Sequence, residues 1–514
     1  MYPGTIAAAT PDKLAVVMAG SGRTMTYRQL DDNSAALAAA LRDLGLGKGD
    51  VVALLADNAP ECFEVYWACM RSGLYITPVN RNLSSDEVSY IVQDSGARVL
   101  IVSAALRELA EKVAARVEVD SAYVFGGEVA GYLSYDELLE SAGARLEDQP
   151  RGADMMYSSG TTGRPKGVRQ AMLPIQVDEP GDAVTGLLAN VFKVGPDDVY
   201  LQPAPIYHAA PLKWTGAVQA LGGTVVMMEK FDAEGALMAI DEHKVTIAQF
   251  VPTMFVRMLQ LPENVRASYD TSSLRLAVHA AAPCPPEVKQ AMIDWWGPVL
   301  FEYYGSTEQH GMSFISSPEW LTKRGSVGKA VIGVAHVCDD HGAELPAGEV
   351  GLIYFERDAR PFEYHNDPEK TAEATHPVHD TWTTVGDMGY LDEDGYLFLT
   401  DRKSFVIISG GVNIYPAEVE GVLTMHDKIF DVGVIGVPDP EMGQSVKAVV
   451  QLKEGVEPSA ELAQEIIDYA RERIAHFKAP RSVSFADELP RLPTGKLVKK
   501  ELERRYAEPV VAGV

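Results

Sequence analysis

Short apolar runs alternate with amphipathic stretches through the N-terminal part of the chain, and this alternation most limits what the chain can fold into. Apolar residues recur at helical spacing over 26–44, and a second helical stretch covers 60–72. The apolar runs 51–55, 75–79 and 98–102 are typical of buried strands. Strands separated by helices pair in parallel and carry helices on their faces, which predicts an α/β fold. No Gly-x-Gly-x-x-Gly follows the early strands, so the fold alone does not indicate dinucleotide binding.

The length of the chain predicts more than one domain. Its 514 residues exceed what a single core usually holds. Near residue 400 the pattern changes, because 386–396 predicts a β-hairpin with an Asp-Gly turn, and a polar segment then precedes a predicted strand at 405–408. We therefore predict a large N-terminal domain, 1–401, and a small C-terminal domain, 402–514.

Charge and cysteine content exclude several kinds of protein. The formal net charge is −27, and residues 402–514 hold 15 Lys and Arg against 17 Asp and Glu, so nearly all of the excess lies upstream. Such an acidic chain is a poor partner for nucleic acid or an anionic membrane. We find no secretory signal and no apolar run of transmembrane length, and predict a cytoplasmic protein without an integral membrane segment. The cysteines form neither a CxxC pair nor a zinc spacing, which predicts reduced thiols at Cys62, Cys69, Cys284 and Cys338.

One loop, 157–168, concentrates the chemistry of a phosphate site. It holds four Ser and Thr hydroxyls, three glycines and two cations within the string Tyr-Ser-Ser-Gly-Thr-Thr-Gly-Arg-Pro-Lys-Gly-Val. Glycine lets backbone N–H groups approach a polyphosphate closely, and hydroxyls and cations add further donors. The loop is not a Walker A motif, because Lys166 follows Pro165 and precedes Gly167.

This string resembles the phosphate loop of the adenylate-forming enzymes, which include acyl- and aryl-CoA synthetases, luciferases and the adenylation domains of nonribosomal peptide synthesis. The resemblance extends over nearly the whole chain and is greatest to the acyl-CoA synthetases. It implies a large domain of parallel-rich sheets with a β-barrel-like part, and a small, mobile α+β domain. It also implies ATP contacts by the loop residues Ser158, Ser159, Gly160, Thr161, Thr162, Gly163 and Lys166.

Further motifs in the family's order complete the implied nucleotide site. In Tyr-Tyr-Gly-Ser-Thr-Glu, the resemblance assigns Thr307 to the α-phosphate and Glu308, with Thr162, to Mg²⁺; hard oxygen ligands suit that ion. Asp387 matches the ribose-binding aspartate, whose carboxylate can accept from both hydroxyls, and Arg402 is expected at the ribose or phosphate. The other implied nucleotide contacts are Ala281, Ala282, Pro283, Glu302, Tyr303, Tyr304 and Gly305.

The resemblance implies a reaction in two half-steps. Lys496, in Pro-Thr-Gly-Lys, matches the adenylation lysine, which stabilises charge while the acid attacks the α-phosphorus of ATP. The small domain then rotates at a hinge, Lys403 or Ser404, and a thiol attacks the acyl-AMP. The residues matching CoA contacts are Gly410 and Gly411 at the pantetheine tunnel, and Phe477 and Arg481 at the CoA nucleotide.

The implied acid pocket is lined mainly by small residues. His208 resembles the aromatic gate between the pocket and the thiol tunnel, and we count it with Lys496, Thr307 and Glu308 as catalytic. Small residues leave volume, and neither Asp nor Lys is present to pair with a charged amino acid. The implied lining, besides His208, is Ala209, Ala280, Ala281, Tyr303, Gly305 and Gly311.

These assignments predict an acyl-CoA synthetase that uses ATP, Mg²⁺ and CoA to activate a bulky hydrophobic carboxylic acid. Medium or long alkyl chains and alicyclic or steroid-type acids fit this expectation. The alternatives are an aryl-acid CoA ligase, a stand-alone adenylation enzyme that loads a carrier protein, a luciferase-like oxygenase and a nonenzymatic nucleotide sensor. Intact Lys496, Glu308 and Asp387 argue against the sensor, and a homodimer is a further possibility.

Overall fold

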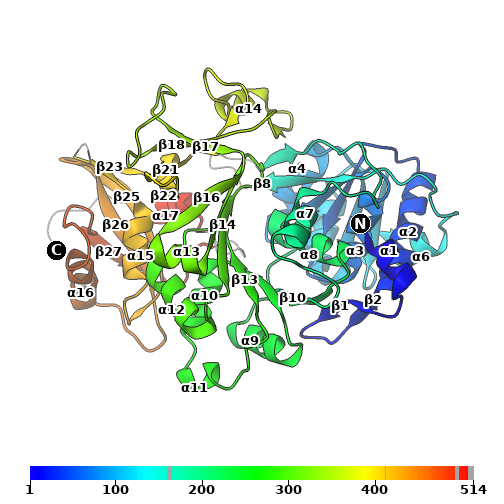
Figure 1. Ribbon diagram of the computed structural model, residues 1–514, viewed down its shortest axis with the longest axis horizontal. Helices are drawn as coiled ribbons and strands as arrows, with labels where there is room; N and C mark the ends of the chain where they lie inside the picture. Colours follow the sequence, from blue (N-terminus) through cyan, green and yellow to red (C-terminus); the bar gives the residue numbers. More distant parts are fainter. Residues whose placement is uncertain (159–164, 411, 492–496, 507–514) are drawn as a thin grey trace.

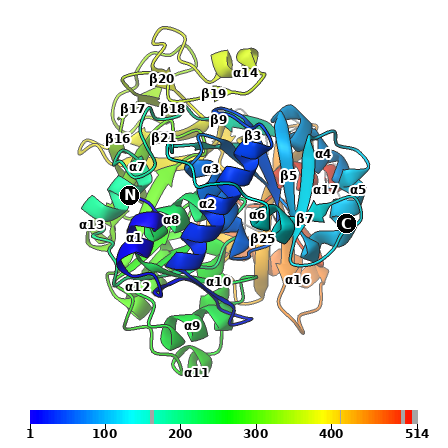
Figure 2. The same ribbon diagram turned by 90° about the vertical axis from the view of Figure 1, so that its right-hand side faces the viewer.

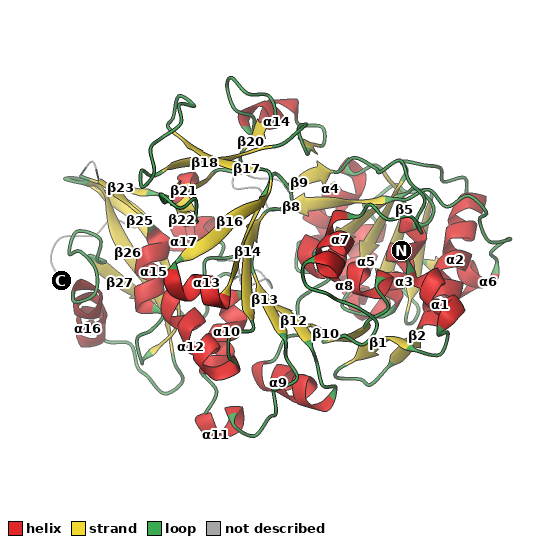
Figure 3. Ribbon diagram, viewed as in Figure 1, coloured by secondary structure: helices red, strands yellow, loops and turns green. Residues whose placement is uncertain are grey.

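The computed structural model describes residues 1–158, 165–410, 412–491 and 497–506 (Figure 1). Within these ranges the chain forms one 14-stranded, one 8-stranded and one 5-stranded sheet. Figure 3 shows helices packed around the two larger sheets, with the smallest sheet and its helices at the opposite end from the N-terminus. The predicted α/β class is confirmed.

The 8-stranded sheet contains the strands predicted from the early apolar runs. Its order is β19-β9-β8-β4-β3-β5-β6-β7; β4, β3, β5, β6 and β7 are parallel, and β8 pairs parallel to β4 but antiparallel to β9. The strands span β3 Val51–Leu55, β4 Tyr75–Val79, β5 Ala97–Ser103, β6 Ser121–Phe125, β7 Leu133–Ser134, β8 Ala153–Ser158, β9 Lys166–Arg169 and β19 Glu363–Tyr364.

Helices cover both faces of this sheet, which explains its continuous apolar strands. In β3, Val52 and Leu54 join the core built with α2 and α3, whereas Val51, Ala53 and Leu55 pack with α4 and α5. Figure 2 shows α2 and the pair α4 and α5 on opposite sides of β3 and β5. The helices span α2 Tyr27–Asp43, α3 Glu61–Met70, α4 Ser85–Asp94, α5 Arg107–Ala114 and α6 Tyr135–Glu140, and the helices predicted at 26–44 and 60–72 are confirmed as α2 and α3.

The 14-stranded sheet is parallel at one end and antiparallel at the other. Its order is β17-β18-β21-β22-β16-β15-β14-β13-β12-β10-β11-β1-β2, with β20 beside β18. Strands β14 to β1 are parallel along this order, β2 pairs antiparallel to β1, and β15 to β17 are antiparallel, so the antiparallel strands continue the same sheet. The strands span β1 Leu14–Met18, β2 Thr24–Thr26, β10 Val199–Gln202, β11 Thr224–Met227, β12 Ile247–Phe250, β13 Leu276–His279, β14 Leu300–Gly305, β15 Met312–Ser316, β16 Ser326–Ile332, β17 Val334–Cys338, β18 Gly351–Glu356, β20 Trp382–Thr383, β21 Asp387–Leu391 and β22 Leu397–Arg402.

The helices beside this sheet include α8, which packs on β10 and β11, and α10 and α12, which pack on each other. The hairpin predicted at 386–396 is confirmed as the β21–β22 pair. The helices of this region span α1 Pro3–Ala9, α7 Ala183–Asn190, α8 Ala209–Ala220, α9 Ala233–Glu242, α10 Pro252–Leu259, α11 Glu263–Arg266, α12 Pro286–Trp296, α13 Ser317–Thr322 and α14 Pro368–Glu373. No helix among the described residues combines the length and apolarity needed to cross a membrane.

The C-terminal unit has its own sheet and core. Strands β24, β23, β26 and β25 are antiparallel, β27 pairs parallel to β26, and α15 and α16 contribute to the main core. The elements are β23 Ile407–Ser409, β24 Val412–Ile414, α15 Pro416–Leu423, β25 Ile429–Asp439, β26 Gly443–Leu452, α16 Ala460–Arg471, β27 Ser482–Phe485 and α17 Lys499–Tyr506.

The junction between the two units corrects one sequence prediction. The strand expected at 405–408 begins later, because η2 (Lys403–Phe405) is a 3₁₀ turn and β23 starts at Ile407. The Lys499 ammonium lies 5.4 Å from the centroid of the Phe405 ring, so Phe405 packs beneath α17 instead of extending the sheet. Strand β22 runs through Arg402, and the exact domain boundary stays a prediction.

Candidate active site

Asp387 joins the end of β14 to the β21–β22 hairpin, two segments that are distant in the sequence. Its Oδ2 accepts a 2.8 Å hydrogen bond from the Tyr304 hydroxyl at the end of β14. Its Oδ1 accepts a 2.9 Å hydrogen bond from Nε of Arg402, its cross-strand partner in the β21–β22 hairpin. A carboxylate has about four lone-pair sites, so two protein donors leave room for ligand hydroxyls. The structure thus brings together three of the predicted nucleotide residues.

Negative charge holds Arg402 in its cationic form. Partial burial lowers the pKa of Arg402, but the carboxylates of Asp387 and Glu308 outweigh this effect and raise it above its ordinary value. Burial and the neighbouring Asp387 carboxylate raise the pKa of Tyr304 well above its usual range, so this hydroxyl remains a donor. The site therefore presents a fixed cation and a fixed anion side by side.

Tyr364 connects Glu308 to the end of the predicted phosphate loop. Its hydroxyl donates a 2.9 Å hydrogen bond to Oε1 of Glu308, which is largely buried. The Lys166 ammonium lies 5.3 Å from the centroid of the Tyr364 ring, and Tyr364 is the cross-strand partner of Val168. Burial and the nearby Lys370 lower the pKa of Lys166. Sequence reasoning missed Tyr364, because nothing in its local sequence marks it and its role depends on the pairing of β19 with β9.

Several predicted residues lie outside the described part of the chain. Strands β8 and β9 pair so that Ser158 and Lys166 are opposite one another, which places the two ends of the phosphate loop side by side. The residues between them that were assigned to ATP, and the assigned Gly411 and Lys496, are not described. Those loop residues are Ser159, Gly160, Thr161, Thr162 and Gly163.

The predicted adenine segment has a strained backbone at its first exposed residue. Ala281 follows β13 by two positions and has a φ of 74°, a conformation that non-glycine residues seldom adopt. Ala280 before it is buried, Ala282 is half-buried and Pro283 is exposed. A tight chain reversal therefore presents this segment at the carboxyl end of β13.

Glu302 forms a buried ion pair with Lys289. Its Oε2 lies 2.6 Å from Nζ of Lys289 and 3.8 Å from Nε2 of His279, and all three side chains are buried. Burial raises the pKa of Glu302, and the Lys289 ammonium partly offsets this. Any contact of Glu302 with a base would therefore use its backbone, because the carboxylate is already paired.

Tyr303 lies on the opposite face of β14 from Tyr304 and belongs to an aromatic wall. Its ring is nearly parallel to that of Trp214, with 6.3 Å between centroids and 11° between planes. Its hydroxyl accepts a 3.1 Å hydrogen bond from Nε2 of Gln249. His208 precedes Ala209, the first residue of α8, and its ring lies 4.5 Å from that of Tyr207. Trp214 and Gln249 were not predicted; Trp214 lies in α8, between β10 and β11, and Gln249 lies in β12.

The two predicted pocket glycines have different surroundings. A Cβ added to Gly305 would meet no atom closer than 3.5 Å, so a methyl group would fit there in ordinary van der Waals contact. A Cβ added to Gly311 would lie 2.0 Å from Cδ1 of Phe355. The structure therefore gives Gly311 a packing role against Phe355, in place of the open pocket wall that we expected.

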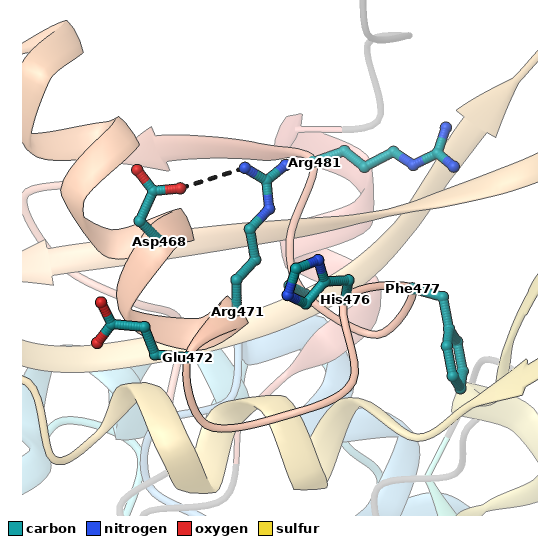
Figure 4. Close-up of a pocket in the computed structure, with 7 residues that line it drawn as sticks. Asp468, Arg471, Glu472, His476, Phe477 and Arg481 are labelled. Carbon is teal, nitrogen blue, oxygen red and sulfur yellow. Dashed lines mark hydrogen bonds and ion pairs between the residues drawn. The ribbon is translucent and has the colours of Figure 1, made fainter.

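Phe477 and Arg481 line an open depression on the C-terminal unit. Arg471 and His476 line it as well, and Figure 4 shows His476 beside Arg471, with Phe477 and Arg481 extending on the side away from Asp468. Phe477 is 55% exposed, and the Arg481 guanidinium lies 3.6 Å from Oδ2 of Asp439. Sequence reasoning missed Arg471 and His476 as parts of this surface.

The remaining predicted residues lie at turns of the chain. Gly410 has a φ of 57°, and a Cβ there would lie 2.4 Å from Cε of Met442, so this turn favours glycine. Of the two hinge candidates, Lys403 pairs with Asp340 at 2.6 Å and Ser404 is exposed.

Comparison with known proteins identifies the family of the chain. The family model described as "AMP-binding enzyme" matches residues 5–359, and the model "AMP-binding enzyme C-terminal domain" matches 418–496. The chain is 34% identical to the fatty acid–[acyl-carrier-protein] ligase ScoC of Streptomyces coeruleorubidus, covering 94% of this chain and 92% of ScoC. It is 35% identical to feruloyl-CoA synthase of an Amycolatopsis species, covering 96% of both chains.

A solved structure extends the likeness to three dimensions. The anthranilate CoA ligase AuaEII, solved in complex with anthranoyl-AMP, superposes with a TM-score of 0.83 at 27% identity, covering 98% of this chain and 96% of AuaEII. Both units of the fold thus have counterparts in this ligase. The chain belongs to the AMP-binding, adenylate-forming enzyme family and is an ATP-dependent, AMP-forming acid–thiol ligase.

Proposed function

We propose that this chain is an acyl-CoA synthetase that activates a bulky hydrophobic carboxylic acid. The acid carboxylate attacks the α-phosphorus of ATP, which gives acyl-AMP and pyrophosphate. The CoA thiol then attacks the acyl carbon, which gives the thioester and releases AMP. Neither step requires a protein nucleophile, so the protein contributes positioning and charge stabilisation.

The arrangement around Asp387 is the observation that carries this proposal. Asp387 would bind the ribose hydroxyls, while Tyr304 and Arg402 keep its carboxylate in place. Glu308 lies on the loop directly after β14, where Thr307 would meet the α-phosphate. These residues and Lys496 would together stabilise the charge that develops as pyrophosphate leaves.

Glu308 also fits the magnesium that accompanies ATP. In proteins this ion is commonly held by one or two carboxylates together with substrate phosphates. Within the described residues there is no group of three or more His, Cys, Asp or Glu that could hold a metal, whereas Glu308 offers one fixed carboxylate. Glu308 and Thr162 would hold the ion, whose positive charge would neutralise the phosphates.

The aromatic wall on the other face of β14 supports a hydrophobic acid. The half-buried Tyr303 ring lies nearly parallel to that of the buried Trp214, and Gly305 beside it adds no side chain. Among the lining positions described, Gln249 is the polar group that contacts Tyr303, and it is uncharged. An apolar acyl chain or ring would displace water from such a surface. His208, at the start of α8, would gate the passage from this pocket to the thiol.

CoA as the acceptor is supported by the depression on the C-terminal unit. Phe477 can stack on a purine, and Arg481 and Arg471 can pair with phosphates. Gly410 and Gly411 would border the path of the pantetheine arm after the unit rotates about Lys403 or Ser404. ScoC is named for a carrier-protein acceptor and feruloyl-CoA synthase for CoA, so relatives of similar identity differ at this step.

An aryl acid is the second candidate substrate. The half-buried ring of Tyr303, stacked near the buried Trp214, is an aromatic group that an aryl ring could contact. Feruloyl-CoA synthase and AuaEII are both named for aromatic acids. Medium-chain, long-chain, alicyclic and aryl acids should therefore be compared directly.

The decisive experiment is a panel of such acids with ATP, Mg²⁺ and either CoA or a carrier protein. AMP formation and the mass of the thioester are measured for each combination. We expect thioester with CoA and an apolar acid. Acid-dependent AMP and thioester with carrier protein alone would overturn CoA as the acceptor, and preference for short polar acids would overturn the hydrophobic pocket.

A further inference from the structure

The six-residue loop 306–311 joins β14 to β15 and carries Thr307 and Glu308. Gly305 and Met312 on either side of it are paired across the two strands. Ser306 and His310 bracket the two functional residues, and Oγ of Ser306 lies 2.8 Å from Nδ1 of His310. A side-chain bridge therefore spans the base of the turn that presents Thr307 and Glu308.

The same loop is restrained at its far end. The Gln309 N–H donates to the Ser306 carbonyl at 3.1 Å, and Gln309 has a φ of 53°. The Arg357 guanidinium donates to the Gln309 carbonyl at 3.1 Å, and the backbone at Gly311 approaches the Phe355 ring too closely for any Cβ. A non-glycine residue keeps a left-handed backbone conformation only where the surrounding contacts hold it in place.

The His310 ring is buried completely and has few polar contacts. Its centroid lies 5.0 Å from that of Phe355 and 6.0 Å from that of Tyr304, with both ring pairs edge-to-face. Among the described residues, Nε2 has no hydrogen-bond partner. The Ser306 hydroxyl is thus the polar contact that orients this ring. A hydroxyl can donate or accept, so the bond forms with either tautomer of the imidazole.

We propose that Ser306 and His310 are positioning residues, whose side-chain bridge holds Thr307 and Glu308 in the geometry that receives MgATP. This inference rests on the proposed roles of Thr307 and Glu308. Neither Ser306 nor His310 needs to touch the nucleotide, because the bridge acts by fixing the turn between them. Loss of a group that orients a metal-binding carboxylate typically lowers metal affinity or activity by about 10- to 100-fold.

The test compares Ser306→Ala, His310→Leu and the double variant by calorimetric titration of MgATP into the protein without acid. Acid-dependent ATP–pyrophosphate exchange is measured in parallel. Each single variant should weaken MgATP binding by about 10-fold or more. The double variant should be no weaker than the worse single variant, because one bridge is lost in every case. Adenosine, which has no phosphate, should bind all variants and the unaltered protein equally.

Ser317→Ala is the matched control. Its hydroxyl donates a 2.7 Å hydrogen bond to the buried Leu300 carbonyl at the opposite end of the same hairpin. This variant should lower the thermal midpoint and leave MgATP binding unchanged. His310→Asn can place an amide near the position of Nδ1 and should recover binding relative to His310→Leu.

The positioning role is overturned if both single variants bind MgATP like the unaltered protein, or if their losses multiply in the double variant. Equal weakening by Ser317→Ala, or no recovery in His310→Asn, would also overturn it. Failure of the proposed function looks different, since the unaltered protein would then convert no acid in the panel. MgATP titration needs no acid and tests the bridge in that case as well.

Discussion

The site around Asp387 and the depression beside Phe477 use charge in different ways. In the first, each charged group already has a protein partner, as Asp387 has Tyr304 and Arg402. In the second, Phe477 is 55% exposed and Arg481 has a loose 3.6 Å contact with Asp439. Charges that are oriented before the ligand arrives stabilise a transition state without reorganisation, whereas exposed groups mainly add binding contacts. Substitutions at the first site should therefore reduce rates strongly, and those at the second should weaken CoA binding modestly.

The largest effect is expected at the buried ion pair of Lys289 and Glu302. Lys289→Met would leave a buried carboxylate without a counter-ion and should lower the free energy of unfolding by about 3–5 kcal/mol. Because burial raises the pKa of Glu302 in the folded state, the defect should be greatest at alkaline pH and shrink as Glu302 becomes protonated on acidification. Urea denaturation across pH measures both effects.

The double variant Lys289→Met/Glu302→Gln provides the control for that substitution. It removes the uncompensated charge and should recover most of the lost stability at every pH. A Lys289→Met protein as stable as the original would show that this ion pair does not stabilise the folded protein.

Substitution of Lys496 tests whether this residue of the C-terminal unit acts only in the first half-reaction. Lys496→Ala should lower acyl-AMP formation by about 10²–10³-fold, the usual effect of deleting one preorganised electrostatic contact. Thioester formation from supplied acyl-AMP should change little, because the lysine is proposed to act in the first half-reaction. Rapid-quench measurement of each half-reaction gives the result. An equal decrease in both would contradict the model of separate conformations.

Asp387→Asn tests the proposed contact between Asp387 and the ribose in the large unit. Losing the charge removes the ion pair with Arg402 and weakens the hydrogen bond from Tyr304, and charge-assisted hydrogen bonds contribute about 1.5–3 kcal/mol. We therefore expect kcat/KM for ATP to fall by about 10- to 100-fold. Asp392→Asn is the matched control, because Asp392 lies in the same hairpin and pairs with Lys323 at 2.7 Å. A similar decrease in both variants would indicate a hairpin defect and not a ribose contact.

The smallest effect is expected at Phe477. Phe477→Leu keeps an apolar side chain and removes the aromatic face, which contributes about 0.5–1.5 kcal/mol in ring stacking. The KM for CoA should rise by at most about tenfold. ATP–pyrophosphate exchange should be unchanged, since it does not require CoA. A large decrease in ATP–pyrophosphate exchange would contradict the proposal that Phe477 contributes to CoA binding and not to adenylation.

The early strands were predictable because their environment is uniform. The runs 51–55 and 75–79 match β3 and β4 residue for residue. Both faces of these strands are covered by helices, so every position is buried, nearly all are apolar, and the run has clear ends. Apolar character wrongly placed Phe405 in a strand. An apolar residue at a junction can instead contact a neighbouring helix, as Phe405 contacts Lys499 at the start of α17.

The sequence by itself determined the α/β class, the two-part organisation and the family, because these depend on periodicity and on motifs that are contiguous in the chain. Tertiary structure alone decided how the site is held together. Tyr364 reaches Glu308 through the pairing of β19 with β9, Glu302 is directed to Lys289, and His310 is buried against Phe355. These contacts join residues from separate segments, and their geometry depends on strand register and close packing, which no local pattern of residues specifies.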